Sequence, residues 1–355
     1  MGFPEINILF KSVAESVVKR GSRGIVFAVM RDLTSAKGVY DMTSAADIPS
    51  GLSAANRAQL AMIFQGGVDA PKKVIAYVQD ATPTDISAPL KYAEAVKFDY
   101  LVVVNATEAE ATEAASAIKS MRSNLNKRVK AVLPHTASDS EGIINFATDD
   151  IVCGAQTYDA NEFCSRIAGL LAGTPLSGSI TFTVLPEVTD VPRMSKVDAG
   201  LLVDAGKLIL FHDGEKVKVA RGVNSLTTLG ADKSEQFKKI KIVDILDMIH
   251  ADITRTAEDN YIGRVTNSYE NKCLLVNAIN AYFDQLEKTG LLERKANECR
   301  IDVDSQRAFL KSSGMNVDEM SDADVKAANT RDKVFLAATV KPVDSMESIE
   351  FVITI

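Results

Sequence analysis

Residues 100–121 read YLVVVNATEAEATEAASAIKSM, in which a short run of branched apolar residues leads through a polar turn into a helical pattern. The first part is typical of a strand buried on both faces of a parallel sheet. Thr107 and Glu110 have the spacing of a capping box, which marks the start of a helix. The apolar residues that follow recur every three or four positions and predict one buried helical face, made of Ala111, Ala114, Ala115, Ile118 and Met121.

The same order of strand and helix extends to both sides of this segment. Short apolar runs predict further strands at four places, namely Gly24–Met30, Val74–Gln79, Val129–Leu133 and Asp150–Gly154. A second helix is expected to begin near Asp159 and to end at Gly173. Strands that alternate with helices imply a parallel sheet covered by helices. The predicted fold class is therefore α/β, with a parallel-sheet domain over residues 21–230.

The pattern changes in the second half of the chain. Asp213 and Gly214 separate two strand-like runs, which favours a hairpin. Apolar residues then follow helical spacing from Phe237 onwards, and a further helix is expected from about Ser268 to Lys288. These two helices predict an antiparallel pair over about residues 233–289. We therefore expect a second domain, of α+β character, over residues 231–340.

A group of basic residues lies near the start of the first of these helices. Lys238, Lys239 and Lys241 could meet an acidic partner surface, although a solvated helix face is the simpler interpretation. Asp244 and Asp247 follow on the same helix, and we interpret them as part of its solvent-facing side.

Both ends of the chain show the two-residue alternation of β-strands. Apolar residues occupy every second position there: Ile6, Ile8 and Phe10 near the start, and Ile349, Phe351, Ile353 and Ile355 near the finish. A strand pattern at a chain end needs a partner strand, because an unpaired one promotes aggregation. We therefore expect residues 1–20 and 341–355 to be arms that form strands with other subunits.

The composition is that of a globular protein and excludes several classes. Lys and Arg together number 40 and Asp and Glu 47, and the resulting net charge of −7 argues against a nucleic-acid partner. The sequence lacks the run of about 18 apolar residues that a membrane span requires, so no membrane partner is expected. The four cysteines lack the spacing of a metal site, which favours free thiols in a reducing cytoplasm.

The sequence contains no motif for a cofactor or a catalytic centre, including the Walker A, dinucleotide-binding, nucleophile-elbow, zinc-protease and EF-hand patterns. An enzyme would have to rest on the α/β fold alone, in which ligands bind at the carboxyl ends of the strands. Asp80, Asn105 and His135 occupy those positions, and only His135 offers evident general-base chemistry. An exposed loop histidine is the simpler interpretation. We expect no catalytic, cofactor or metal site, and an α/β enzyme of unknown substrate is the alternative.

Three ordered sets of segments carry a family resemblance. They are Pro4–Lys11 with Arg23–Val26, then Ser195–Gly206 leading into Arg221–Leu226, then Ile240–Asp247 with Tyr261–Asn267 and a closing strand pair around Val334–Val340 and Ile349–Ile355. Together they resemble the tail sheath proteins of contractile phage tails, including prophage-derived tails and R-type bacteriocins of Gram-positive bacteria. The resemblance covers residues 1–30 and 195–355. No single segment is diagnostic of the family, and the order in which all of them occur makes the resemblance specific.

The resemblance implies a homo-oligomer, in which subunits form a helical array of stacked six-fold rings around a tail tube protein. It also implies contacts with baseplate and tail terminator proteins, assembly in the host bacterial cytoplasm, and contraction that drives the tube through a target envelope. The α/β domain would face outward, residues 231–340 would face the tube, and the arms would complete sheets of neighbouring subunits. Lys238, Lys239 and Lys241 are then candidates for tube contacts. Another strand-swapping sheath, like those of secretion systems, is the remaining alternative.

Contraction of such an array implies hinges between rigid domains. The linkers near Val13–Gly21 and Lys341–Ser348 are the expected places, with Gly21, Gly24 and Pro342 at their ends. Glycine and proline at these positions suit a change of backbone direction outside the two hydrophobic cores.

Overall fold

The computed structural model of the chain describes residues 18, 21, 23–82, 85–231 and 233–354. Among them, residues 21–251 together with 344–354 form one compact unit, here named the α/β unit, and residues 252–343 form a second, the small unit. The chain therefore passes from the first unit to the second inside helix α6 (Ile240–Asn260). The boundary expected at residue 230 lies upstream of this division, because the first half of α6 belongs to the α/β unit.

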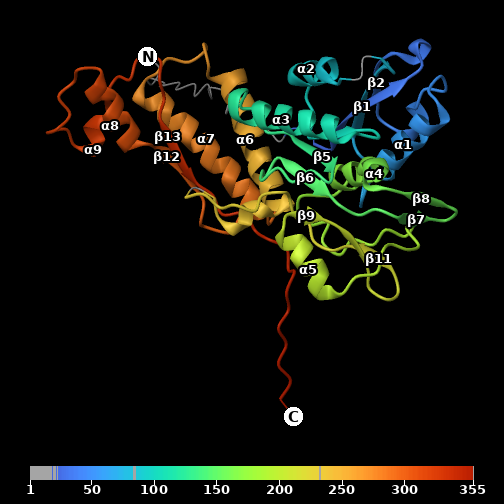
Figure 1. Cartoon of the computed structure of the whole chain (residues 1–355). Coiled ribbons are helices and arrows are strands. Elements are labelled where there is room, and N and C mark those ends of the chain that lie inside the picture. Colours follow the sequence, from blue (N-terminus) through green and yellow to red (C-terminus); the bar gives the residue numbers. More distant parts are fainter. Residues whose placement is uncertain (1–17, 19–20, 22, 83–84, 232, 355) are drawn as a thin grey trace, which may run out of the picture. The chain divides into compact units, whose positions relative to one another are not determined.

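A twisted sheet forms the centre of the α/β unit (Figure 1). Within the described residues it has seven strands in the order β2-β3-β1-β4-β5-β6-β9. All neighbours pair in parallel except β2, which is antiparallel to β3. The strands are β1 (Ile25–Asp32), β2 (Gly38–Met42), β3 (Lys73–Asp80), β4 (Tyr100–Val103), β5 (Lys130–Pro134), β6 (Ile143–Phe146) and β9 (Lys207–Leu208).

Helices cover both faces of this sheet, as an α/β fold requires. Helices α1 (Ala54–Gln65) and α4 (Ala160–Ala172) bury their apolar side chains on the face that carries Val26 and Ala28. Helices α2 (Ser87–Ala95) and α3 (Glu108–Asn124) cover the face that carries Phe27 and Val29. Successive residues of β1 thus point into two different cores, which explains why the strand is apolar along its whole length.

The capping box at the start of α3 is confirmed. The backbone N–H of Thr107 donates to Glu110 Oε2 over 2.9 Å, and the N–H of Glu110 donates to Thr107 Oγ1 over 3.4 Å. The predicted apolar face of this helix is also confirmed, because the alanines, isoleucine and methionine named above are all buried in the second core.

All five predicted strands form, but only four of them belong to the parallel sheet. Residues 150–154 do not join the parallel sheet, because β7 (Ile151–Cys153) pairs in antiparallel fashion with β8 (Gln156–Tyr158). The sheet instead continues from β5 to β6. Only residues 135–142 connect these two parallel strands, and this connection is too short to contain a crossover helix. The alternation of strands and helices in the sequence therefore did not indicate β6.

The hairpin predicted around Asp213 and Gly214 is confirmed as β10 (Leu210–His212) and β11 (Val217–Val219). Gly214 adopts φ +109°, a conformation that side chains other than glycine's rarely tolerate. Helix α5 (Lys196–Asp204) precedes the hairpin and is capped by Ser195, whose Oγ accepts from the N–H of Asp198 over 3.1 Å. Three short 3₁₀ helices complete the unit: η1 (Thr34–Ala36), η2 (Ala45–Asp47) and η3 (Glu235–Lys238).

The small unit consists mainly of helices. Helix α7 (Tyr269–Lys288) agrees with its predicted bounds and packs beside the strand β12 (Glu298–Ile301). The strand β13 (Leu336–Thr339) pairs with β12 in antiparallel register. The sequence predicts a closing strand pair around Val334–Val340 and Ile349–Ile355. Among the described residues, only the first of these two segments forms a strand. Helices α8 (Val303–Ser312) and α9 (Asp322–Ala327) enclose a small core of Leu310, Val317 and Val325. Every helix in the described part of the chain is too short or too polar to span a bilayer.

Candidate functional site

The segment Asp344–Thr354, here named the C-terminal segment, leaves its apolar side chains in solvent. Ile349 is 83% exposed, Phe351 80% and Ile353 72%. Figure 1 draws its distal part as an extended red trace, and none of its described residues lies in a strand or a bridge. Large exposed apolar side chains in a row mark a surface that a partner covers. The apolar residues that alternate in the sequence are therefore exposed, and the described residues of the same chain supply no partner strand for them. Their pairing with another subunit stays a prediction.

The start of this segment is held on the α/β unit by a group of polar contacts, here named the root clamp. Its members from the body of the unit are Thr181, Arg221, Lys239 and Lys241, and those from the C-terminal segment are Asp344, Ser345 and Glu347. Lys239 and Lys241 flank the first residue of α6, Arg221 follows β11, and Thr181 precedes the hairpin. Four sequence-distant segments therefore meet at this point.

Glu347 is the centre of the root clamp. Its Oε1 accepts from Thr181 Oγ1 over 2.8 Å. Its Oε2 accepts from Arg221 Nε over 2.9 Å, and Arg221 Nη2 lies 2.8 Å from the same oxygen. Lys239 Nζ lies 3.2 Å from it. The Glu347 side chain is only 8% exposed, so these contacts replace most of its water.

Two further residues of the C-terminal segment, Asp344 and Ser345, take part in the root clamp. Lys239 Nζ also pairs with Asp344. Lys241 Nζ donates to Ser345 Oγ over 3.0 Å and to the Ser177 carbonyl oxygen over 3.1 Å. The contacts therefore involve three of the first four residues of the segment.

The electrostatics favour the ionised form of Glu347. Burial raises the pKa of Glu347, while the hydrogen bonds from Thr181 and Arg221 lower it. The positive charges of Lys239 and Arg221 lower it further, and the resulting pKa lies below the ordinary value of 4.5. Burial also lowers the pKa of Lys241, against the opposing effect of Asp344 and Glu347. Charge-assisted contacts of this kind are about twice as strong as neutral hydrogen bonds.

The three lysines singled out in the sequence thus have different surroundings. Lys238 pairs with Glu235 at 3.0 Å on the surface. Lys239 and Lys241 hold the C-terminal segment, and Lys241 is only 9% exposed. The interpretation of a freely solvated face is therefore wrong for these two, because a distant segment covers them. The contact of all three lysines with a tail tube stays a prediction.

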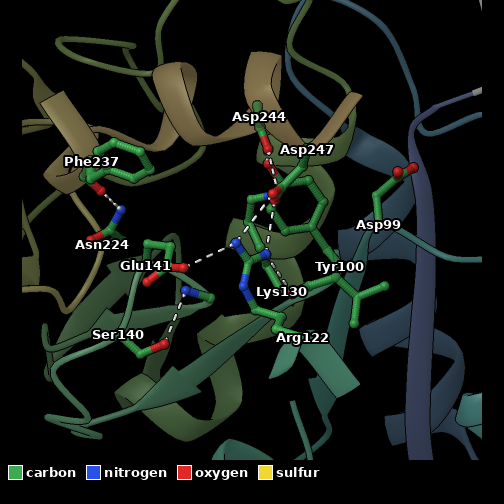
Figure 2. Close-up of polar contacts among 12 residues, drawn as sticks. Asp99, Tyr100, Arg122, Lys130, Ser140, Glu141, Asn224, Phe237, Asp244 and Asp247 are labelled. Atoms are coloured by element: carbon green, nitrogen blue, oxygen red, sulfur yellow. Dashed lines mark hydrogen bonds and ion pairs between the residues drawn. The ribbon is translucent and has the colours of Figure 1, made fainter. Parts of the chain in front are cut away.

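A second polar cluster lies beneath the first half of α6 (Figure 2). Lys130 Nζ, on β5, lies 2.9 Å from Asp244 Oδ1 and 2.6 Å from Asp247 Oδ2. Arg122, on α3, makes two contacts with the Asp247 carboxylate, at 2.9 and 3.2 Å. Tyr100 donates its hydroxyl to Asp244 Oδ2 over 2.6 Å. The cluster, here named the buried ion network, joins one turn of α6 to the sheet and to α3.

The interpretation of Asp244 and Asp247 as solvent-facing residues is therefore wrong. The first half of α6 is buried on nearly all sides. Ile242, Val243 and Ile245 are at most 1% exposed, and Asp244 and Asp247 are only 7% and 8% exposed. The two carboxylates therefore lie inside the α/β unit together with the apolar side chains of the helix. Buried charges need partners of opposite sign, which Lys130 and Arg122 provide.

The shared charges shift the pKa values within this network. Burial raises the pKa of Asp244, but the charges of Lys130 and Arg23 outweigh it, and the pKa is lowered overall. Burial and the neighbouring Asp244 raise the pKa of Tyr100 well above its usual value, which keeps its hydroxyl a donor. Glu141, which accepts from Arg122 and Lys233, has a pKa of about 2, because these contacts outweigh its burial. The contacts of the network connect α6 to β4, β5 and α3 and fix its position on the sheet.

The positions considered for an enzyme do not converge. A cleft of about 980 Å³ opens at the carboxyl ends of β4 and β5, and His135 and Asp149 line it. His135 Nε2 lies 2.9 Å from Asp149 Oδ2, and both side chains are about half exposed. Asp80 and Asn105 do not line this cleft. The described residues bring together no group of three or more metal-binding side chains. His135 is thus an exposed loop histidine.

The hinge candidates have well-defined surroundings where the structure describes them. Gly24 has φ +83°, and a Cβ there would lie 2.8 Å from the carbonyl oxygen of Ala172. Its own carbonyl accepts from the N–H of Lys72 over 2.8 Å, so Gly24 is tied into the start of β1. Pro342 forms an isolated bridge with Leu292 in the small unit. A hinge role for Gly21, Gly24 and Pro342 stays a prediction, and the arm residues Ile6, Ile8, Phe10 and Ile355 lie outside the described residues.

Comparison with known proteins identifies the family. The phage tail sheath protein central domain matches residues 79–225, and the phage tail sheath C-terminal domain matches residues 232–355. The tail sheath protein of Clostridium phage phiCD119 is 38% identical over 355 residues, which covers 98% of each chain.

Solved structures share the fold at lower identity. The helical sheath of the anti-feeding prophage in its contracted state gives a TM-score of 0.72 at 16% identity, covering 100% of this chain and 99% of that chain. The sheath tail protein of Listeria innocua gives 0.71 at 19% identity, covering 94% and 95%. These relatives are structural proteins, which decides against the enzyme alternative. The chain belongs to the phage tail sheath protein family and is a structural component of a contractile tail.

Proposed function

We propose that this chain polymerises helically around a tail tube, and that the resulting sheath contracts to drive the tube through the envelope of a target cell. The exposed C-terminal segment is the observation that carries the proposal. Its apolar residues alternate in the sequence and lack a partner strand among the described residues, and the root clamp holds only its first residues on the α/β unit. A segment of this kind is suited to β-augmentation, in which it adds a strand to another subunit.

The small unit offers a suitable acceptor. Among the described residues, the ladder of β12 and β13 has no third strand, so backbone groups on its edges are available to an incoming strand. Donor and acceptor lie at different places on the same chain, and such a heterologous contact repeats from subunit to subunit. When the rotation that relates successive subunits does not close them into a ring, the contact generates a helical array. We propose stacked six-fold rings as its form, with the N-terminal residues 1–20 as a second arm.

The partners follow from this role. We propose that the sheath contacts the tail tube, a baseplate and a tail terminator, and that it assembles in the cytoplasm of the bacterial host. Residues 21–230 would face outward and residues 231–340 the tube. The anti-feeding prophage sheath, which shares the fold, is solved in a contracted state, and this supports contraction here. Burial of about 200 Å² more apolar surface per subunit would supply about 5 kcal/mol at 25 cal/mol per Å².

The test is to remove the apolar face of the C-terminal segment. Ile349, Phe351 and Ile353 would be replaced by serine in one variant, and Glu350, Val352 and Thr354 by alanine in a control that alters the opposite side of the same strand. We expect the first variant to stay folded, with an unchanged circular dichroism melt, and to form no tubes in electron micrographs. The control should form tubes. Tubes of normal length from the first variant would refute the proposed role of the arm.

A further inference from the structure

The free part of the C-terminal arm begins later than the sequence indicates. Residues 341–348 were expected to form a hinge as a whole. In the structure, however, the contacts of Asp344, Ser345 and Glu347 attach the first part of this stretch to the α/β unit. Met346 points away and is 93% exposed, so the backbone around it is held through its neighbours on both sides. The first residue beyond the clamp is Ser348.

We propose that Glu347 is the positioning residue of the arm, fixing the arm's origin on the α/β unit so that only Ser348–Ile355 moves to a neighbouring subunit. This inference rests on the proposed function, since it assumes that the arm pairs with another subunit. Glu347 suits the role better than Asp344, because it meets a hydroxyl, a guanidinium and an ammonium group at once and is almost completely buried.

The position of the origin limits the reach of the arm. Residues 348–355 span at most about 26 Å when fully extended, at about 3.3 Å per residue. If the clamp opened, the free length would begin at residue 344 and the reach would increase to about 40 Å. The clamp therefore restricts the arm to an acceptor edge that begins within about 26 Å of Glu347, in every state of the sheath. A neighbour farther away is excluded, which gives the pairing its specificity.

The clamp also raises the effective concentration of the arm at its acceptor. For a flexible tether this concentration falls with about the −3/2 power of the tether length. Lengthening the free part from residues 348–355 to residues 344–355 should lower it about twofold. The loss of a fixed starting direction adds to this effect, so twofold is the smallest change expected.

The first experiment compares Glu347→Gln with Glu350→Gln. Both variants lose one negative charge from the C-terminal segment, but Glu350 lies beyond the clamp and none of the described contacts of the clamp involves it. We expect Glu347→Gln to raise the critical concentration for tube formation at least twofold and to speed amide hydrogen exchange in residues 344–347. The exchange of the sheet should stay unchanged. Glu350→Gln should behave as wild type, and Glu347→Asp should restore part of the loss. Equal critical concentrations for Glu347→Gln and wild type would overturn the proposal.

The second experiment tests whether the clamp survives assembly. A water-soluble carbodiimide activates a carboxylate, and an adjacent amine then displaces the activating group to form an amide, while the carboxylate oxygen leaves in the urea by-product. Lys239 Nζ is close enough to Glu347 for this reaction without a spacer. Peptide mapping should find the cross-link from Lys239 to Glu347 in soluble subunits, in extended sheaths and in contracted sheaths. Its presence in subunits and loss from sheaths would show that the origin moves and would refute the proposal.

The two proposals fail in distinguishable ways. If the variant without the apolar arm face still forms tubes, the arm itself is dispensable. If that variant fails to assemble while Glu347→Gln assembles as wild type, only the positioning role of Glu347 is refuted.

Discussion

Lys130 Nζ lies 2.6 Å from Asp247 Oδ2, although the two residues are separated by 117 positions in the chain. The lysine comes from the middle of a buried strand and the aspartate from the first half of α6. Each also has a second partner of opposite charge, because Asp247 contacts Arg122 and Lys130 contacts Asp244. The pair is therefore the link between the sheet and α6 within a network of several buried contacts.

Replacing Lys130 with methionine should destabilise the α/β unit strongly. The change keeps most of the volume but removes the ammonium group that Asp244 and Asp247 share, and leaves each with one guanidinium partner, Arg23 and Arg122. Breaking a buried ion pair typically costs about 3–5 kcal/mol, and the remaining partners make this the upper end of the expected loss. The measurement is the free energy of urea unfolding. Lys91→Met on the exposed surface of α2 is the matched control and should change it by less than about 0.5 kcal/mol. Equal values for both variants would mean that the network is not needed for stability.

Acid should destabilise the protein through Glu141. Its pKa in the folded chain is about 2, below the ordinary value of 4.5, so its contribution is complete above about pH 4.5 and is lost as the pH falls towards 2. The lowered pKa of Asp244 acts in the same direction. Urea unfolding between pH 7 and pH 3 should show a decline that begins below about pH 5. In Glu141→Gln the stability should already be lower at pH 7 and should decline less steeply. A slope identical to that of the wild type would contradict this assignment.

Gly24→Ala should lower stability whether or not the residue acts as a hinge. Its φ of +83° and the short approach to the carbonyl oxygen of Ala172 leave no room for a methyl group. We expect a loss of about 1–3 kcal/mol, measured by thermal or chemical unfolding. Gly51→Ala is the control, because a Cβ there meets no atom within 4 Å. If Gly24→Ala were as stable as the control and only contraction were impaired, Gly24 would be a hinge and not a structural glycine.

Lys238→Glu separates the tube contact from the root clamp. Reversal of all three lysines would also release the C-terminal segment, since Lys239 and Lys241 hold it. Lys238 pairs only with the exposed Glu235 among the described ion pairs, so its reversal should spare the fold. If it contacts an acidic tube, assembly on tubes should weaken by about 0–1 kcal/mol per subunit and respond to salt. Co-sedimentation with tubes at two salt concentrations measures this. Unchanged binding would remove Lys238 from the tube contact.

The local sequence pattern predicted those helices and strands whose own residues carry a clear signal. The helix over residues 108–124 follows from its capping box and apolar spacing, and four central strands follow from their apolar runs. The strand β6 was missed because its identity depends on pairing with β5 and not on its own short sequence. The strand predicted at residues 150–154 was assigned to the wrong sheet for the same reason.

The candidate sites were harder to predict, because their members meet only in three dimensions. The exposed alternation of residues 349–353 was visible in the sequence, but Glu347 gave no local sign of its contacts with Thr181 and Arg221. The buried ion network did leave a sign. Lys130 interrupts an apolar strand, and Asp244 and Asp247 interrupt a helix that is otherwise apolar on all sides. Charges placed in such surroundings indicate buried partners of opposite sign.

The hairpin turn at Asp213 and Gly214 has a practical consequence. The glycine has open space around it, and the turn lies between two short strands that do not belong to the central sheet. A peptide epitope inserted there would leave both termini untouched. It would then recur with every copy of the chain, so that a weakly binding peptide would be presented as a dense multivalent array.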